Sequence, residues 1–244
     1  MSSLAGRRIL LTRDVDDSAA WAERIAACGA LPVLLPCIRK QAIDTPELRS
    51  ALAAAVQTAD WLVLTSKRGV AAFAALCAAP LSARTRIAVV GGATAEAARA
   101  ALGRADLIGG GTADRLGQAL AAAIDRARQP HVLLALAANA DDALARTLSR
   151  AGARCTRCDV YRTVPAPPRE PKQALSTLGA DNIVLASPSA VTGLLHQLAL
   201  DAPAAVYTIG PSTTAAALAH GLNVTAEARS PSFEGILEAM QCRQ

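Results

Sequence analysis

The chain has 244 residues, a length that suits two domains of about 100–150 residues each. Hydrophobic residues make up 52% of it and aromatic residues only 2%, so its core must be built from aliphatic side chains. The net charge of +5 comes from scattered arginines without interleaved aromatics, which argues against nucleic-acid binding and fits a small polyanionic substrate.

In the first half of the chain, short apolar runs alternate with helix signals, a pattern typical of parallel strands joined by helices. Residues 16–18 are candidate N-caps of the first helix, and Thr45 followed by Pro46 is a strong start for the second. We expect strands at residues 8–13, 30–35, 60–66, 87–90 and 105–108, an extended segment at 37–43, and helices at about 16–27, 45–57, 70–78, 94–102 and 112–126.

The same order of elements then repeats. The run 131–136 corresponds to 9–13, and 181–187 corresponds to 60–66. Further expected elements are a strand at 154–161, helices at 141–150 and about 171–178, and a last helix opened by residues 230–234. We therefore interpret the chain as a tandem duplication of two doubly wound, parallel α/β domains, with the repeat dividing near residue 122.

One motif occurs in both halves, at residues 89–103 and 208–221. Each copy has a short strand, a glycine (Gly91, Gly210), a threonine three residues later (Thr94, Thr213) and an alanine-rich helix. Each threonine is expected to be the helix N-cap, at the carboxyl end of a strand, where open α/β sheets bind ligands. A single copy is equally a common structural turn, but the duplication favours paired sites. Glu96, expected in the first helical turn, makes phosphate a less favourable ligand than a carboxylate or a neutral group.

Cysteine and histidine give no sign of metal or redox chemistry. The six cysteines are expected to be reduced, and Cys155 and Cys158 fall in a predicted strand, where residues three apart face opposite sides. The three histidines are interpreted as structural or surface residues. No apolar run reaches the roughly 18 residues of a membrane span, and no signal peptide opens the chain. We expect a cytoplasmic protein without membrane or nucleic-acid partners.

Hydroxyl groups mark the ends of corresponding strands, at Ser66 in the first half and at Ser187 and Ser189 in the second. These positions lie at the expected ligand-binding edge. Tyr161, one of only two tyrosines, ends the strand that leads into a proline-rich stretch. Its hydroxyl can donate a hydrogen bond to a leaving group. Alternatively, Tyr161 is a structural residue whose ring is half-buried on an edge strand.

Seven stretches, in order and over essentially the whole chain, resemble the uroporphyrinogen-III synthase family. Each is weak alone, but the ordered set is specific. They are Ile-Leu-Leu-Thr-Arg (9–13), Gly-Ala-Leu-Pro-Val-Leu-Leu-Pro (29–36), Trp-Leu-Val-Leu-Thr-Ser-Lys-Arg-Gly-Val (61–70), Val-Val-Gly-Gly-Ala-Thr-Ala (89–95), Val-Tyr-Arg-Thr-Val-Pro (160–165), Leu-Ala-Ser-Pro-Ser-Ala-Val (185–191) and Ile-Gly-Pro-Ser-Thr-Thr-Ala (209–215).

The resemblance implies a cyclising hydro-lyase of haem and other tetrapyrrole biosynthesis. Its substrate is the linear tetrapyrrole hydroxymethylbilane, which carries eight carboxylates. The enzyme removes water, inverts the last pyrrole ring through a spiro intermediate and closes uroporphyrinogen III, without cofactor or metal. Catalysis then rests on positioning and on stabilisation of charge. We expect a monomer, and a transient contact with the preceding pathway enzyme is compatible with this interpretation.

The resemblance also implies functional residues. Tyr161 falls on the family's catalytic tyrosine, as donor to the departing hydroxyl. Arg13 and Arg68 are either charge-assisted donors to substrate carboxylates or solvated surface charges. The full substrate-binding set comprises Arg13, Ser66, Arg68, Gly91, Thr94, Ser187, Ser189, Gly210 and Thr213.

The family's domain division differs from the repeat boundary. It implies one discontinuous domain of residues 1–36 plus 165–244 and a second of residues 37–164. Two linker strands, about 37–43 and 159–164, would run side by side, with the active site in the interdomain cleft. So narrow a hinge predicts large relative motion of the domains.

The sequence departs from the family at two places. Asp14 stands where the family usually has proline, and residues 135–142 lack the usual glycines and arginine and contain Asp141 and Asp142. This loss of a carboxylate-binding arginine keeps an alternative open, namely a non-catalytic two-domain protein that binds tetrapyrroles or other polycarboxylates. A third hypothesis, an enzyme acting on a sugar or nucleotide, is disfavoured because the sequence contains no phosphate loop.

Overall fold

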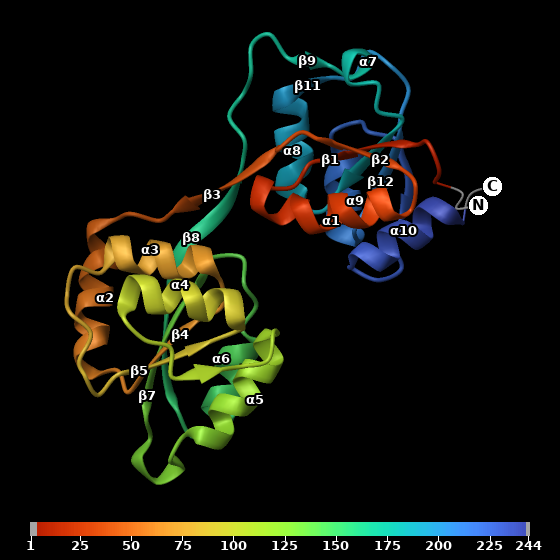
Figure 1. The fold of residues 1–244 in the computed structure, drawn as a ribbon. Coiled ribbons are helices and arrows are strands. Elements are labelled where there is room, and N and C mark those ends of the chain that lie inside the picture. The colour runs from red at the N-terminus through yellow and green to blue at the C-terminus, as the bar shows by residue number, and fades with distance from the viewer. Residues whose placement is uncertain (1–3, 243–244) are drawn as a thin grey trace. The chain divides into compact units, whose positions relative to one another are not determined.

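The computed structural model describes residues 4–242, and the chain divides into two compact units. Unit 1 comprises Met1–Arg39 with Val164–Gln244, and unit 2 comprises Lys40–Thr163. Each unit has its own, mainly parallel sheet with helices packed on it (Figure 1). The predicted fold class, α/β with parallel sheets, is confirmed.

Unit 1 is built on a five-stranded sheet in the order β13–β12–β10–β1–β2, and all four pairings are parallel. Its strands are β1 (Arg8–Leu11), β2 (Leu31–Leu34), β10 (Asn182–Leu185), β12 (Ala205–Thr208) and β13 (Val224–Glu227). Its longer helices are α1 (Val15–Ala27), α8 (Pro188–Gln197), α9 (Pro211–Ala219) and α10 (Phe233–Gln241). A small second sheet pairs β9 (Gln173–Ala174) with β11 (Leu198–Ala199), beside the short α7 (Leu175–Leu178).

Unit 2 is built on a six-stranded sheet in the order β3–β8–β7–β4–β5–β6. Its strands are β3 (Ile38–Ala42), β4 (Trp61–Leu64), β5 (Arg86–Val89), β6 (Leu107–Ile108), β7 (His131–Ala137) and β8 (Arg154–Pro165). Its helices are α2 (Pro46–Thr58), α3 (Lys67–Leu76), α4 (Gly92–Leu102), α5 (Ala113–Ala123), the 3-10 turn η1 (Arg126–Arg128) and α6 (Ala143–Arg150). The chain passes between the units through β3 and β8.

The two sheets repeat one topology. The order β6–β5–β4–β7–β8 in unit 2 corresponds strand for strand to β13–β12–β10–β1–β2 in unit 1. The corresponding strands are the ones that the internal repeat of the sequence aligns. In each sheet the order reverses between two central strands, β4 and β7 in unit 2 and β10 and β1 in unit 1. The loops that leave such a pair go to opposite faces, and open α/β sheets bind ligands at this switch point, at the carboxyl ends of the strands.

The sheet of unit 2 is buried on both faces, as its continuous apolar strands predict. One face packs against α2, α3 and α4, and the other against α5 and α6 (Figure 1). All four residues of β4 are buried. Since the core is almost entirely aliphatic, the elements lie close together. At Gly193 of α8, in unit 1, an added Cβ would lie only 1.6 Å from the carbonyl oxygen of Cys37.

Two of the predicted helices in unit 1 differ from the structure. Helix α1 begins at Val15 and not at a cap within residues 16–18, because the Asp14 carbonyl already accepts from the N–H groups of Asp17 and Ser18. The helix expected at 171–178 shrinks to α7, because residues 173–174 pair with β11 as a strand. Strand β13 was not predicted. By contrast, Thr45 caps α2 as expected, accepting from the Leu48 N–H at 3.2 Å.

His131 is a buried structural residue at the start of β7, in agreement with the interpretation from sequence. Its ring nitrogens are hydrogen-bonded to the hydroxyls of Thr58 (Nδ1, 2.9 Å) and Thr156 (Nε2, 2.8 Å). Burial, followed by the nearby Arg154 guanidinium, lowers the pKa of His131 against the opposing effects of Thr58 and Asp60. The folded protein therefore favours the neutral imidazole.

This lowered pKa predicts a loss of stability in mild acid. As the pH falls below about 6.5, the usual histidine pKa, the unfolded chain takes up a proton before the folded chain does, so the free energy of unfolding decreases. The drop should be smaller in His131→Gln, as measured by urea denaturation between about pH 8 and pH 5. His220→Gln, at an exposed position, is the matched control and should keep the wild-type dependence. An unchanged pH dependence in His131→Gln would contradict the assignment.

Candidate functional site

The switch point of unit 2 lies where β4 and β7 end. Ser66 follows β4 and is the N-cap of α3, its Oγ accepting from the Gly69 N–H at 2.9 Å. The same Oγ lies 3.0 Å from the hydroxyl oxygen of Tyr161 on β8. Gly69 leaves room for this contact, because a Cβ there would come within 3.3 Å of Ser66 Oγ and 3.8 Å of Tyr161 Cε1. The structure thus brings together two residues predicted from sequence, Ser66 and Tyr161.

A β-bulge in β8 controls the direction of Tyr161. Leu136 of β7 pairs with Asp159 of β8, but the next residue, Ala137, pairs with Tyr161. Val160 is therefore an extra residue in β8. A bulge of this kind places two successive side chains on the same face of the sheet.

The consequence is that Tyr161 changes face. By strict alternation it would share a face with Arg157 and Asp159, on the α6 side of the sheet. Instead its ring packs beside Val160 on the core that faces α3. Only on that face does its hydroxyl meet Ser66.

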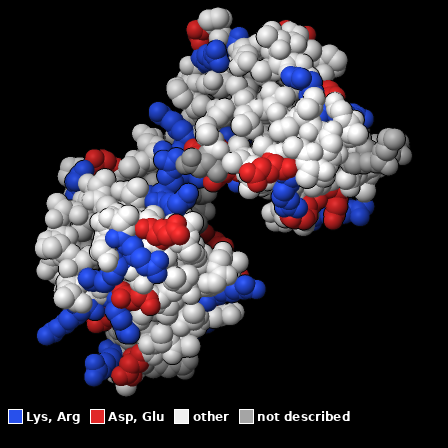
Figure 2. Space-filling view, viewed as in Figure 1, with Lys and Arg blue, Asp and Glu red and all other residues white. Residues whose placement is uncertain are grey.

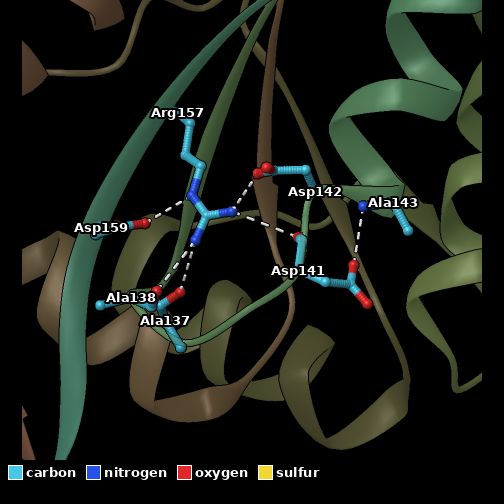
Figure 3. Close-up of polar contacts among 7 residues, drawn as sticks. All are labelled: Ala137, Ala138, Asp141, Asp142, Ala143, Arg157 and Asp159. Carbon is cyan, nitrogen blue, oxygen red and sulfur yellow. Dashed lines mark hydrogen bonds and ion pairs between the residues drawn. The ribbon is translucent and has the colours of Figure 1, made fainter.

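Arg157 holds the loop that follows β7 (Figure 3). Its guanidinium donates to Asp159 Oδ1 (Nε, 2.8 Å), to Asp142 Oδ1 (Nη1, 2.7 Å) and to the carbonyl oxygens of Ala137 and Ala138 (Nη2, 3.2 and 3.4 Å). The hydrogen bond with Asp159 is the main cause of the raised pKa of Arg157. We call this arrangement the Arg157 clamp. Sequence reasoning missed it, because Arg157 and its loop partners are far apart along the chain.

Residues 135–142, where the sequence departs from the family pattern, contain two acids, and the clamp accounts for one of them. Asp142 is bound by Arg157, and Asp141 Oδ1 accepts from the Ala143 N–H at 2.8 Å, at the start of α6. Both acids therefore have partners within unit 2. The loop also supports the tyrosine, since the Ala138 N–H donates to the Tyr161 carbonyl at 2.8 Å.

Unit 1 has an equivalent switch point with different side chains. Ser187 is the N-cap of α8, accepting from the Ala190 N–H at 3.2 Å, but its hydroxyl partner is Ser189 at 3.0 Å. Arg13 follows β1, and its guanidinium carbon lies 4.2 Å from the centre of the Trp21 ring. Arg13 Nε is buried and has no hydrogen-bond partner among the described residues, and burial lowers the pKa of this side chain. Arg13 is thus half-buried and stacked, and Arg68, in unit 2, is exposed.

The threonines of the repeated motif do not cap their helices. Gly91 and Gly210 are the N-caps, without a side-chain hydrogen bond, because each glycine turns the strand directly into the helix. Thr94 and Thr213 are the third helical residues and are only 5% and 1% exposed. The threonine hydroxyls are therefore buried in both motifs, whereas Gly92, Ala93 and Ser212 in the first helical turns are exposed. Glu96 lies beyond the first turn of α4, so its carboxylate no longer argues against an anion there.

Residues 4–242 contain neither a membrane-spanning helix nor a cluster of metal ligands. Among residues 4–242, no helix is both long and apolar enough to cross a bilayer. In the same part of the chain, no three or more His, Cys, Asp or Glu side chains are grouped so that they could hold a metal ion.

The Arg157 clamp predicts a matched pair of variants. Arg157→Gln leaves Asp142 and Asp159 without their cation and should lower the free energy of unfolding by about 1–3 kcal/mol. Arg150→Gln, an exposed arginine on α6, should change it by about 0.5 kcal/mol or less. Urea denaturation measures both, and hydrogen exchange should show a less protected Ala138 amide only in Arg157→Gln. Equal effects of the two variants would count against the clamp.

Comparisons with known proteins agree with this architecture. The chain matches the family model described as uroporphyrinogen-III synthase HemD over residues 19–238. Similar solved structures include uroporphyrinogen-III synthetase from Helicobacter pylori 26695 (14% identity, TM-score 0.56, 96% of this chain and 97% of that chain). Another is a mutant uroporphyrinogen III synthase from the extremely thermophilic bacterium Thermus thermophilus (19% identity, TM-score 0.52, 96% and 97%).

At these identities the structural likeness shows the fold alone. No curated protein matches the chain. The family model, however, covers most of the sequence. The chain therefore belongs to the uroporphyrinogen-III synthase family.

Proposed function

We propose that the chain is an active uroporphyrinogen-III synthase, a cyclising hydro-lyase that converts hydroxymethylbilane to uroporphyrinogen III. The hydrogen bond between Ser66 and Tyr161, in a chain of this family, is the observation that carries the proposal. The alternative of a non-catalytic binding protein is not favoured, because the chain matches the synthase family model over residues 19–238.

The first chemical step is departure of the substrate's hydroxyl group, which needs a proton or a strong hydrogen-bond donor. The Tyr161 O–H is the proposed donor. One lone pair of Ser66 Oγ accepts from Gly69 N–H, which leaves the serine proton available to donate to the phenol oxygen. The phenol proton is then free for the leaving group.

Helix α3 assists this step electrostatically. Ser66 is its N-cap, so the phenol oxygen of Tyr161 lies one hydrogen bond from the positive end of the helix dipole. As the proton moves to the leaving hydroxyl, negative charge develops on the phenol oxygen. The oriented Gly69 N–H and Ser66 O–H stabilise that charge without reorganising.

After the hydroxyl has left, the remaining steps are carbon–carbon bond formation and ring inversion, in which the protein acts by positioning the reacting ring. We propose that the substrate is held by hydroxyls, first-turn amides and cations of both units. Thr94 and Thr213 are buried, so we assign them support of the helix starts at Gly91 and Gly210. The proposed binding set is therefore Arg13, Ser66, Arg68, Gly91, Ser187, Ser189 and Gly210, with Thr94 and Thr213 of the predicted set as supporting residues.

We further propose a cytoplasmic monomer that acts without a cofactor. The six cysteines Cys28, Cys37, Cys77, Cys155, Cys158 and Cys242 are all free thiols, which supports a reducing compartment. Burial raises the pKa of Cys37 to about 12, so this thiol is unreactive at neutral pH.

The proposed reaction is tested by the isomer that is formed. Purified protein is incubated with hydroxymethylbilane generated in situ, and the uroporphyrinogens are separated by chromatography. We expect isomer III, because the protein must impose inversion of the last ring. Without protein the substrate closes to isomer I, so isomer I alone would overturn the proposal.

The role of Tyr161 predicts a kinetic effect. Tyr161→Phe removes the proton donor but keeps the ring, and should lower kcat by about 10- to 1000-fold. Ser66→Ala keeps the phenol and removes its supporting hydroxyl, so a smaller loss is expected. The measurement is the initial rate of isomer III formation at saturating substrate.

Two controls separate chemistry from folding. Tyr207→Phe removes the other tyrosine hydroxyl, which lies in the core of unit 1. Ser232→Ala removes a cap of the same kind from α10, where Ser232 Oγ accepts from the Gly235 N–H at 3.1 Å. Both should keep near-wild-type kcat. A wild-type rate in Tyr161→Phe would show that positioning alone suffices.

A further inference from the structure

A pocket of about 230 Å³ opens beside Tyr161 in unit 2. It lies between α3 and the two strands β3 and β8, and we call it the α3–β3 pocket. Its lining residues are Lys40, Ala42, Arg68, Ala71, Ala72, Ala75 and Tyr161.

The shape of the pocket follows from spacing along two elements. Its four α3 residues, at positions 68, 71, 72 and 75, recur at helical intervals and share one face of the helix. Lys40 and Ala42 are two residues apart on β3 and therefore share one face of the strand. Three of the four helix positions are alanines, and these short side chains leave space between the helix and the strands.

The charge of the pocket is positive. Lys40 and Arg68 contribute two cations from different elements, and none of the lining residues is acidic. Figure 2 shows lysine and arginine side chains gathered over the region of β3 and β8. Lys40 is half-buried and Arg68 is exposed, so one cation lies deeper than the other. An alanine floor beneath two cations suits a short aliphatic arm that ends in a carboxylate.

We propose that the α3–β3 pocket binds one carboxylate-bearing side arm of the linear tetrapyrrole, and that Lys40 is a substrate-binding residue. The inference rests on the proposed function. Because Tyr161 lines the same pocket, an arm held there binds beside the proposed proton donor. The contact to the carboxylate is the same before and during departure of the hydroxyl, so it contributes to substrate binding and not to the chemical step.

The test is a split between KM and kcat. Lys40→Gln should raise KM for hydroxymethylbilane about three- to tenfold with kcat changed less than about twofold, because one charge-assisted contact to a partly exposed group is lost. Lys40→Arg keeps the cation and should restore most of the affinity. Ala75→Leu fills the floor of the pocket with the charges intact and should also raise KM.

Arg39→Gln is the matched control. Arg39 is the exposed neighbour of Lys40 on β3, faces the other side of the strand and does not line the pocket. The Arg39→Gln substitution removes one positive charge, as Lys40→Gln does, and should leave KM near the wild-type value. Thermal unfolding of each variant confirms that the fold is kept.

The outcomes distinguish this inference from the proposed function. If the wild-type protein forms only isomer I, the proposed function fails. If it forms isomer III but Lys40→Gln and Ala75→Leu keep the wild-type KM, the pocket assignment fails and the function stands. Equal rises of KM in Arg39→Gln and Lys40→Gln would show that the substrate is attracted by the positive charge of this region in general, and would overturn the assignment of Lys40 to the pocket.

Discussion

The pairing of β8 with β7 is the constraint on which the candidate site depends. A regular strand would place Tyr161 on the face of Arg157, away from α3. The extra residue Val160 reverses the alternation, and the phenol then reaches the cap of α3. The Arg157 clamp fixes the strand and the adjoining loop on the opposite face. The two sides of one strand therefore have separate roles, because one side orders the backbone and the other presents the hydroxyl.

The two units share a topology but not a chemistry. Strand β2 of unit 1 corresponds to β8 of unit 2, yet it has only four residues, whereas β8 has twelve. Strand β2 is therefore too short to place a residue where β8 places Tyr161, and unit 1 has no counterpart of this tyrosine. Its cap, Ser187, turns to Ser189 instead. This asymmetry places the pairing of a cap serine with a tyrosine in unit 2 alone.

The sequence predicts most elements, because buried parallel strands are short apolar runs bounded by caps and glycines. Ser66 and Tyr161 were also identifiable, as a strand-end hydroxyl and a rare aromatic. Their contact was not, since it depends on a bulge and on strand register, which no local pattern encodes. The prediction that Thr94 and Thr213 are N-caps was wrong for a related reason. A glycine can itself begin a helix, and the hydroxyl three residues later is then inside it. The clamp partners of Arg157 likewise meet only in the folded sheet.

The discontinuity of unit 1 has a consequence for biosynthesis of the chain. All strands of unit 2 are complete once residue 165 has been made, and its central strand β4 pairs with β5 and β7, with Trp61 opposite Arg86 and Val132. The central strand β1 of unit 1, by contrast, pairs with β10, with Ile9 opposite Asn182. During synthesis β1 and β2 therefore lack their partner strand β10 until more than half of the chain has followed, and their apolar side chains stay without the core that covers them. The inserted unit can fold while the unit that surrounds it is still being translated.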